Sequence, residues 1–168
     1  ETAGIAVQAA LTGHLVMSSV HANSAFSVLE RFTYMDVDPA SFVEALNGVV
    51  AQRLVRRVCP DCAEEAAPDA NIARLAQLPE AQLNQGHYRV GKGCEACRHT
   101  GYRGRLALAD VLTLTDRIKE GLLNRSSAST LRELAREAGH VFIRDIALAH
   151  AAQGDTTLKE VHRVISLY

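Results

Sequence analysis

The sequence contains no tryptophan, and only 5% of its 168 residues are aromatic, so it has few of the stacking side chains that single-stranded nucleic acid binders use. It also lacks an excess of charge of either sign, because 18 Lys and Arg face 19 Asp and Glu. This balance gives no overall electrostatic reason to expect nucleic acid or an anionic membrane as a partner. No apolar run approaches the length of a bilayer-spanning helix. We therefore expect a soluble globular protein with one hydrophobic core, no nucleic-acid partner and no transmembrane segment.

Export features are missing from the N-terminus as well. Residues 1–3, Glu-Thr-Ala, contain neither an initiator methionine nor a basic segment. We therefore expect the chain to be a fragment of a longer protein. A cytoplasmic location is expected, because nothing directs export and free thiols persist in the cytosol.

A phosphate-binding loop is also absent from the sequence. The nearest candidate is residues 86–93, Gly-His-Tyr-Arg-Val-Gly-Lys-Gly. A P-loop needs Ser or Thr directly after its lysine and then a helix, whereas Gly93 and Cys94 follow Lys92. We interpret this stretch as a glycine-rich entry to a metal-binding turn, and expect no P-loop in this chain.

The sequence does contain four cysteines, arranged as two C-x-x-C pairs: Cys59 with Cys62, and Cys94 with Cys97. Two intervening residues let both sulfurs of a pair turn toward one ion, so the arrangement predicts a tetrahedral zinc site. Four thiolates leave no open coordination position for water or substrate, which indicates a structural site. Two disulfides or a redox-active C-x-x-C are the alternative interpretations.

The N-terminal third alternates between helical and extended patterns, which indicates an α/β protein. Residues 3–12 predict a mostly buried helix that ends at Gly13, and residues 15–20 predict an interior strand of a parallel sheet. Two more helices are expected, the first capped by Asn23 or Ser24 and the second by Asp38 ahead of a proline. The apolar side chains assigned to these two helices are Phe26, Val28, Leu29, Phe32 and Met35 in the first, and Phe42, Val43, Leu46, Val49 and Val50 in the second.

The rest of the chain divides into an insert and a helical end. We expect residues 54–58 to be extended, residues 63–93 to hold one helical patch around 72–78, and residues 100–104 to form a turn before a strand or hairpin over 105–114. Four helices should follow. Their expected starts are Thr115 or Asp116, Ser127 or Ser129, the residues just before Ile143, and Thr157 in a capping box with Glu160, and the expected helix-ending glycines are Gly139 and Gly154.

Two histidines flank the predicted strand at 15–20. Ligands of open α/β sheets gather beyond the carboxyl ends of strands, so His21 is a candidate functional residue, and His14 is a candidate at the opposite end. Extended chain separates the two by roughly 20 Å, which argues against a shared ligand atom. The alternative is that both are hydrogen-bonded histidines at element boundaries.

Several ordered stretches resemble the C-terminal half of the type II secretion traffic ATPase, the general secretion pathway protein E family. The type IV pilus assembly ATPases share nearly the same pattern. The resemblance spans almost the whole chain, and the insert and parts of the last helices match loosely. The stretches are ETA at 1–3, AALTGHLV at 9–16, VHANSA at 20–25, VAQRLVRR at 50–57, CEAC at 94–97 and TGYRGR at 100–105.

The resemblance implies the C-terminal part of a RecA-like P-loop ATPase domain. Residues 1–58 would belong to the ATPase core, 59–104 would be a tetracysteine zinc-binding arm, and 105–168 would contain return strands and a C-terminal helical subdomain. The intact protein would be a homohexamer that binds ATP and Mg²⁺ between subunits. Its ATP hydrolysis would drive pseudopilus assembly and protein export, with inner-membrane secretion-platform proteins as partners at the cytoplasmic face.

Site residues are implied too. Residues 12–25 would be the family's histidine box, with His14 and His21 as its two histidines, and His21 would lie near the nucleotide and couple its state to domain position. The family's Walker A loop, acidic box and Walker B segment precede the matching region, so we expect no ATP hydrolysis by this chain alone. The resemblance assigns the metal to Cys59, Cys62, Cys94 and Cys97; Ser19, Val20 and Ala22 stand where Thr, Leu and Thr are usual.

Arginines flank both cysteine pairs and predict either a solvated face or a contact with another subunit or an anionic partner. A zinc-ribbon module that binds nucleic acid is an alternative function, and steep salt dependence of oligonucleotide binding would identify it. A purely structural interaction domain is a third interpretation. The arginines are Arg53, Arg56, Arg57, Arg98, Arg103 and Arg105.

Overall fold

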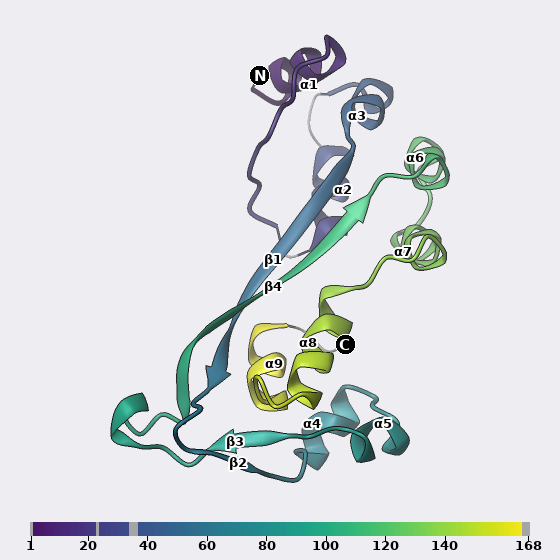
Figure 1. Ribbon diagram of the computed structural model, residues 1–168. Helices are drawn as coiled ribbons and strands as arrows, with labels where there is room; N and C mark the ends of the chain where they lie inside the picture. The colour runs from purple at the N-terminus through teal and green to yellow at the C-terminus, as the bar shows by residue number, and fades with distance from the viewer. Residues whose placement is uncertain (1, 23, 34–36, 166–168) are drawn as a thin grey trace. The chain divides into compact units, whose positions relative to one another are not determined.

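The computed structural model describes residues 2–22, 24–33 and 37–165 and shows a mixed α/β protein (Figure 1). The chain forms two compact units, residues 1–51 with 110–141 and residues 52–109 with 142–168. Predictions that concern Asn23, Met35 and the side chain of Phe32 lie outside the described residues. No described helix combines the length and the apolar character that crossing a bilayer requires.

The described strands form two separate two-stranded sheets. In the first, β1 (Gly48–Val58) pairs with β4 (Tyr102–Thr113), and the two arrows run in opposite directions in Figure 1. In the second, β2 (Ala63–Glu65) pairs antiparallel with β3 (Arg89–Gly91), and the residue partners include Ala63 with Gly91. The predicted extended segment at 54–58 and strand at 105–114 are therefore confirmed.

The first unit contains five helices among its described residues. Helix α3 contacts α1, α2 and α6, and α6 contacts α7. Local caps account for their starts: the side chains of Asp38, Thr115 and Ser127 each accept a hydrogen bond from a backbone N–H of the first helical turn, as predicted. The helices are α1 (Thr2–Leu11), α2 (Ala25–Thr33), α3 (Pro39–Ala45), α6 (Asp116–Leu123) and α7 (Ala128–Glu137).

The second unit has one hydrophobic core, to which the insert contributes directly. Ile72, Ala76 and Tyr88 of the insert lie in one buried cluster with side chains of the first sheet and of the C-terminal helices. The helices of this unit are α4 (Ala70–Leu75), α5 (Glu80–Asn84), the short 3-10 helix η1 (Glu95–Cys97), α8 (Ile143–Ala152) and α9 (Leu158–Val164). The other members of the cluster are Val55, Leu108, Ala147, Leu148, Ala151, Leu158, Val161 and Ile165.

The predicted interior strand at 15–20 is wrong. These residues form no helix or strand and pair with no described strand, and the side chains of Leu15 and Met17 are each 88% exposed. An interior strand needs neighbours on both edges to satisfy its backbone groups, and the described part of the chain supplies none here. The preceding helix α1 is likewise less buried than predicted, because among its residues only Val7 is buried and Ile5 is largely exposed.

The helix predicted from Pro39 through Val50 ends at Ala45. Its apolar positions fit a helix, but Asn47 and Gly48 interrupt it, and the β-branched valines that follow lie in β1. The turn predicted at 100–104 is also too long, because β4 already begins at Tyr102.

Candidate functional site

Each cysteine pair connects a strand of the first sheet to a strand of the second. Cys59 and Cys62 lie between β1 and β2, and Cys94 and Cys97 lie between β3 and β4. The antiparallel register of β2 with β3 brings the pairs together, and the Lys92 N–H donates to the carbonyl of Cys62 at 3.0 Å. Two segments more than thirty residues apart in sequence thereby meet at one point.

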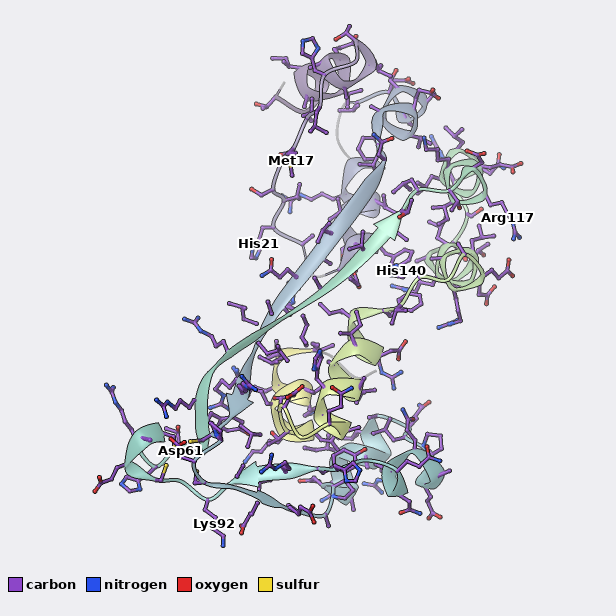
Figure 2. The ribbon with its side chains drawn as sticks, in the orientation of Figure 1. Met17, His21, Asp61, Lys92, Arg117 and His140 are labelled. Carbon is purple, nitrogen blue, oxygen red and sulfur yellow. The ribbon has the colours of Figure 1, made fainter. Side chains whose placement is uncertain are left out.

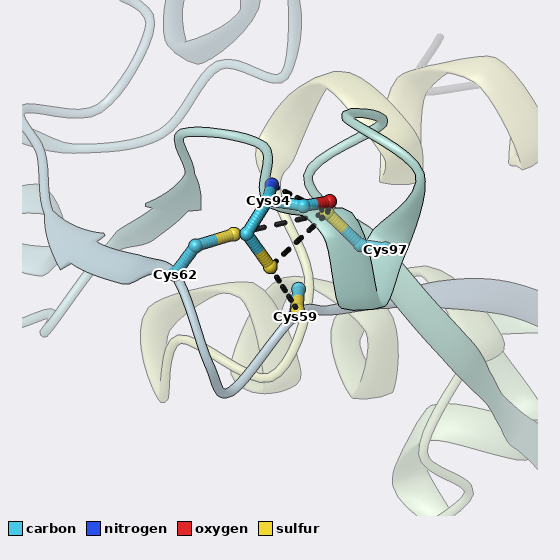
Figure 3. Close-up of side chains that lie close together, drawn as sticks. All are labelled: Cys59, Cys62, Cys94 and Cys97. Atoms are coloured by element: carbon cyan, nitrogen blue, oxygen red, sulfur yellow. Dashed lines mark hydrogen bonds between the residues drawn. The ribbon is translucent and has the colours of Figure 1, made fainter.

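The four sulfur atoms converge on that point (Figure 3). Sγ–Sγ distances are 3.9 Å for Cys59 and Cys94, 3.9 Å for Cys62 and Cys97, and 3.8 Å for Cys94 and Cys97. All four atoms lie within 4.8 Å of one another. The cysteines are free thiols rather than disulfides, and this cluster can hold a metal ion.

Backbone N–H groups point at two of the sulfurs. The amides of Cys94 and Gly101 donate to Cys97 Sγ at 3.1 and 3.3 Å, and the Gly93 amide donates to Cys62 Sγ at 3.3 Å. The Cys94 amide is the main cause that lowers the pKa of the Cys97 thiol to about 6, whereas burial raises the pKa of Cys62 to about 12. The N–H donors favour thiolate sulfur, the form that binds metals.

Two glycines permit the close approach of the cysteine loops. Gly101 has a φ of +75°, and a Cβ there would lie 2.4 Å from the carbonyl oxygen of Gly91. Gly93 has a φ of +95°, and its Cβ would lie 2.8 Å from the carbonyl oxygen of His99. Any side chain at either position would push the loops apart.

His14 and His21 lie outside this cluster, on the segment of the first unit between α1 and α2. Both are exposed. His14 Nδ1 is 3.2 Å from the Thr12 hydroxyl, and the carbonyl oxygen of His21 accepts a hydrogen bond from Arg31 at 3.1 Å. Figure 2 marks His21 and Met17 along this segment. The strand expected between the two histidines is absent, and their functional role stays a prediction.

The arginines near the cysteines do not share one environment. Arg56 forms an ion pair with Glu160 at 2.7 Å, and Arg103 pairs with Asp61 at 2.6 Å. Three others are exposed, and Arg53 donates a hydrogen bond to the carbonyl of Gln52 at 3.0 Å. The exposed three are Arg57, Arg98 and Arg105.

Sequence reasoning missed two buried polar groupings. The sequence predicts a capping box between Thr157 and Glu160, but only the Thr157 half of that box forms, and the Glu160 carboxylate binds arginines instead. In the first unit, His140 Nε2 lies 3.9 Å from the carboxylate of Asp110, and both side chains are almost fully buried. Neither grouping leaves a periodic or spacing signal in the sequence, because the partners come from distant segments.

Known proteins resemble this chain over nearly its whole length. The family model described as type II/IV secretion system protein matches residues 1–163. A type IV pilus assembly ATPase PilB of Thermus thermophilus is 44% identical over 96% of the chain, and a type II secretion system ATPase E of Vibrio cholerae is 41% identical over 98%. The type II secretion system protein E of Aeromonas hydrophila is 40% identical over 98%. The chain covers 18% of the length of the first relative and 32% of each of the other two. By this match across almost every residue, the chain belongs to the type II/IV secretion system protein family.

Proposed function

We propose that this chain is the C-terminal part of a RecA-like P-loop ATPase that powers protein export by the type II secretion system. The observation that carries the proposal is its similarity, at 35–44% identity over nearly the whole chain, to proteins named as secretion or pilus ATPases and their relatives. The intact protein would form a homohexamer and bind ATP and Mg²⁺ between subunits. It would drive pseudopilus assembly at the cytoplasmic face of the inner membrane, together with membrane-embedded platform proteins.

Type IV pilus assembly is the second candidate function. The observation that favours it is the 44% identity to a pilus assembly ATPase, against 41% and 40% to two type II secretion proteins. A difference of a few percent does not separate the two systems. Complementation of a secretion mutant and of a pilus mutant by the intact protein would separate them.

Within such a motor, we assign residues 1–58 to the ATPase core, 59–104 to the metal-binding arm and 105–168 to the return strand and C-terminal helices. The metal is proposed to be zinc. A tetrahedron with Zn–S bonds of about 2.3 Å has edges of roughly 3.8 Å. Three of the six Sγ–Sγ distances are 3.8–3.9 Å, and all six are within 4.8 Å. Cys59, Cys62, Cys94 and Cys97 would hold the ion in a closed shell, so it would stabilise the arm and take no part in ATP hydrolysis.

His21 and His14 are proposed to belong to the nucleotide-coupling segment of the motor. Their exposure in this chain supports the proposal, because the side chains are accessible to a nucleotide or to another part of the intact protein. In the intact protein, we expect His21→Ala to lower kcat for ATP hydrolysis at least about tenfold. His87→Ala, in the exposed part of the insert, is the matched control and should leave kcat unchanged.

Two results would contradict this function. One is an intact protein without ATPase activity, and the other is an unchanged kcat in the His21 variant. The 168-residue chain alone should show no ATP turnover under the same conditions.

A further inference from the structure

Glu160 is a fully buried carboxylate at the start of α9. It accepts hydrogen bonds from the Arg56 backbone N–H at 2.9 Å and from the Arg56 guanidinium at 2.9 and 2.7 Å. Arg163 donates two more, at 2.7 and 2.6 Å. The carboxylate is therefore well satisfied, and it fixes both the backbone and the side chain of a residue in β1.

The same stretch of β1 has other partners in the C-terminal segment. The Thr156 hydroxyl donates to the carbonyl of Arg56 at 2.8 Å, and the Val58 N–H donates to the carbonyl of Asp155 at 2.9 Å. Together with Glu160, these groups occupy an edge of β1, as a neighbouring strand would. Val58, which makes the last of these bonds, directly precedes Cys59.

The other strand that leaves the cysteine cluster is held by α9 as well. Gly101 donates its N–H to Cys97 Sγ, and its carbonyl accepts from the Cys59 N–H at 2.9 Å. The next residue, Tyr102, places its hydroxyl 2.7 Å from that of Thr157, the cap of α9. The Arg56 guanidinium lies 4.1 Å from the centre of the Tyr102 ring, so the two connections contact each other.

We propose that residues 155–160, which lead into α9 and form its first turn, are the outer support of the tetracysteine centre, with Glu160 and Tyr102 as positioning residues. Metal binding and docking of α9 would then be one coupled equilibrium, in which each strengthens the other by the same factor. The physical reason is that Cys59 and Cys97 bind an ion well only if the strands that carry them are held in place. This inference rests on the proposed metal centre.

Competition for Zn²⁺ between the 168-residue chain and a chromophoric chelator tests the proposal. Glu160→Gln should weaken zinc affinity by about tenfold or more, the range known for residues that support metal ligands. Tyr102→Phe, which keeps the ring and removes only the hydroxyl, should weaken it about threefold, as expected for loss of one hydrogen bond. The matched control is Glu137→Gln, which removes an exposed partner of Arg117 in the first unit and should leave zinc affinity unchanged.

Hydrogen exchange measures the same coupling in the other direction, as the effect of zinc on the docking of α9. Chelation of zinc should increase amide exchange in α9, while exchange in α7 of the first unit should stay constant. A wild-type chain that binds no zinc would overturn the metal centre and this inference together. Zinc binding with wild-type affinity in folded Glu160 and Tyr102 variants, or α9 protection that is insensitive to chelation, would overturn the inference alone. If circular dichroism shows that Glu160→Gln is unfolded, Tyr102→Phe and the exchange data decide.

Discussion

Glu160 carries its charge at a position that water does not reach. Burial by itself would raise the pKa of this carboxyl, but the hydrogen bonds from Arg163 and Arg56 outweigh burial and lower the pKa from 4.5 to about 2. Because the pKa is lower in the folded state, the stabilisation is fully present above pH 4.5 and is lost as the pH falls toward 2. The two ion pairs of this buried carboxylate thus make the second unit sensitive to acid.

Replacing Glu160 by Gln should lower the free energy of unfolding by about 3 kcal/mol at pH 7, because two arginines lose their buried partner. The difference from wild type should shrink as the pH falls from 4.5 toward 2. Urea unfolding, monitored by circular dichroism with chelator present throughout, measures this difference in the free energy of unfolding without a contribution from metal release. A difference that stays constant across this pH range would contradict the assignment.

Substitutions at Gly101 and Gly104 distinguish the free-energy cost of a positive φ from the cost of a steric clash. Both have φ values near +76°, but a Cβ at Gly101 meets the Gly91 carbonyl whereas a Cβ at Gly104 meets nothing within 4 Å. Gly104→Ala should therefore cost about 1 kcal/mol, and Gly101→Ala about 3 kcal/mol. Equal losses in thermal or urea unfolding would show that the close approach of the loops contributes nothing.

At the scale of elements, the starts of helices were predictable and the strands less so. Asp38, Thr115, Ser127 and Thr157 cap helices through bonds to the residue three positions further along the chain, so the local sequence contains the signal. The apolar run at 15–20 has the composition of a buried strand, but burial depends on neighbours that composition does not specify. The structure shows it exposed and outside any helix or strand.

Substitutions in that run test its environment. Leu15→Ser and Met17→Ser should change the stability of this chain by less than about 0.5 kcal/mol, as is usual for exposed positions. Leu29→Ala, at a side chain only 1% exposed in α2, is the comparison and should cost about 2–5 kcal/mol. A large loss at Leu15 would instead support the buried strand that the sequence suggests.

At the scale of the whole molecule, the spacing of the cysteines predicted which side chains meet, because the C-x-x-C turn is a local feature that metal sites require. The support of that cluster was not predictable. Arg56 and Glu160 are 104 residues apart, and only the folded second unit shows that they touch. The insert's share of the core was missed for the same reason, because Tyr88 becomes buried only against distant elements.

We propose that the four cysteines form a closed metal centre that organises the second unit of this secretion-family protein. X-ray absorption at the zinc edge of the purified chain, combined with elemental analysis, tests it most directly. We predict one zinc per chain, surrounded by four sulfur atoms at about 2.3 Å and no nitrogen or oxygen ligand. A chain without stoichiometric metal, or a zinc ion with water or histidine in its coordination shell, would contradict the account.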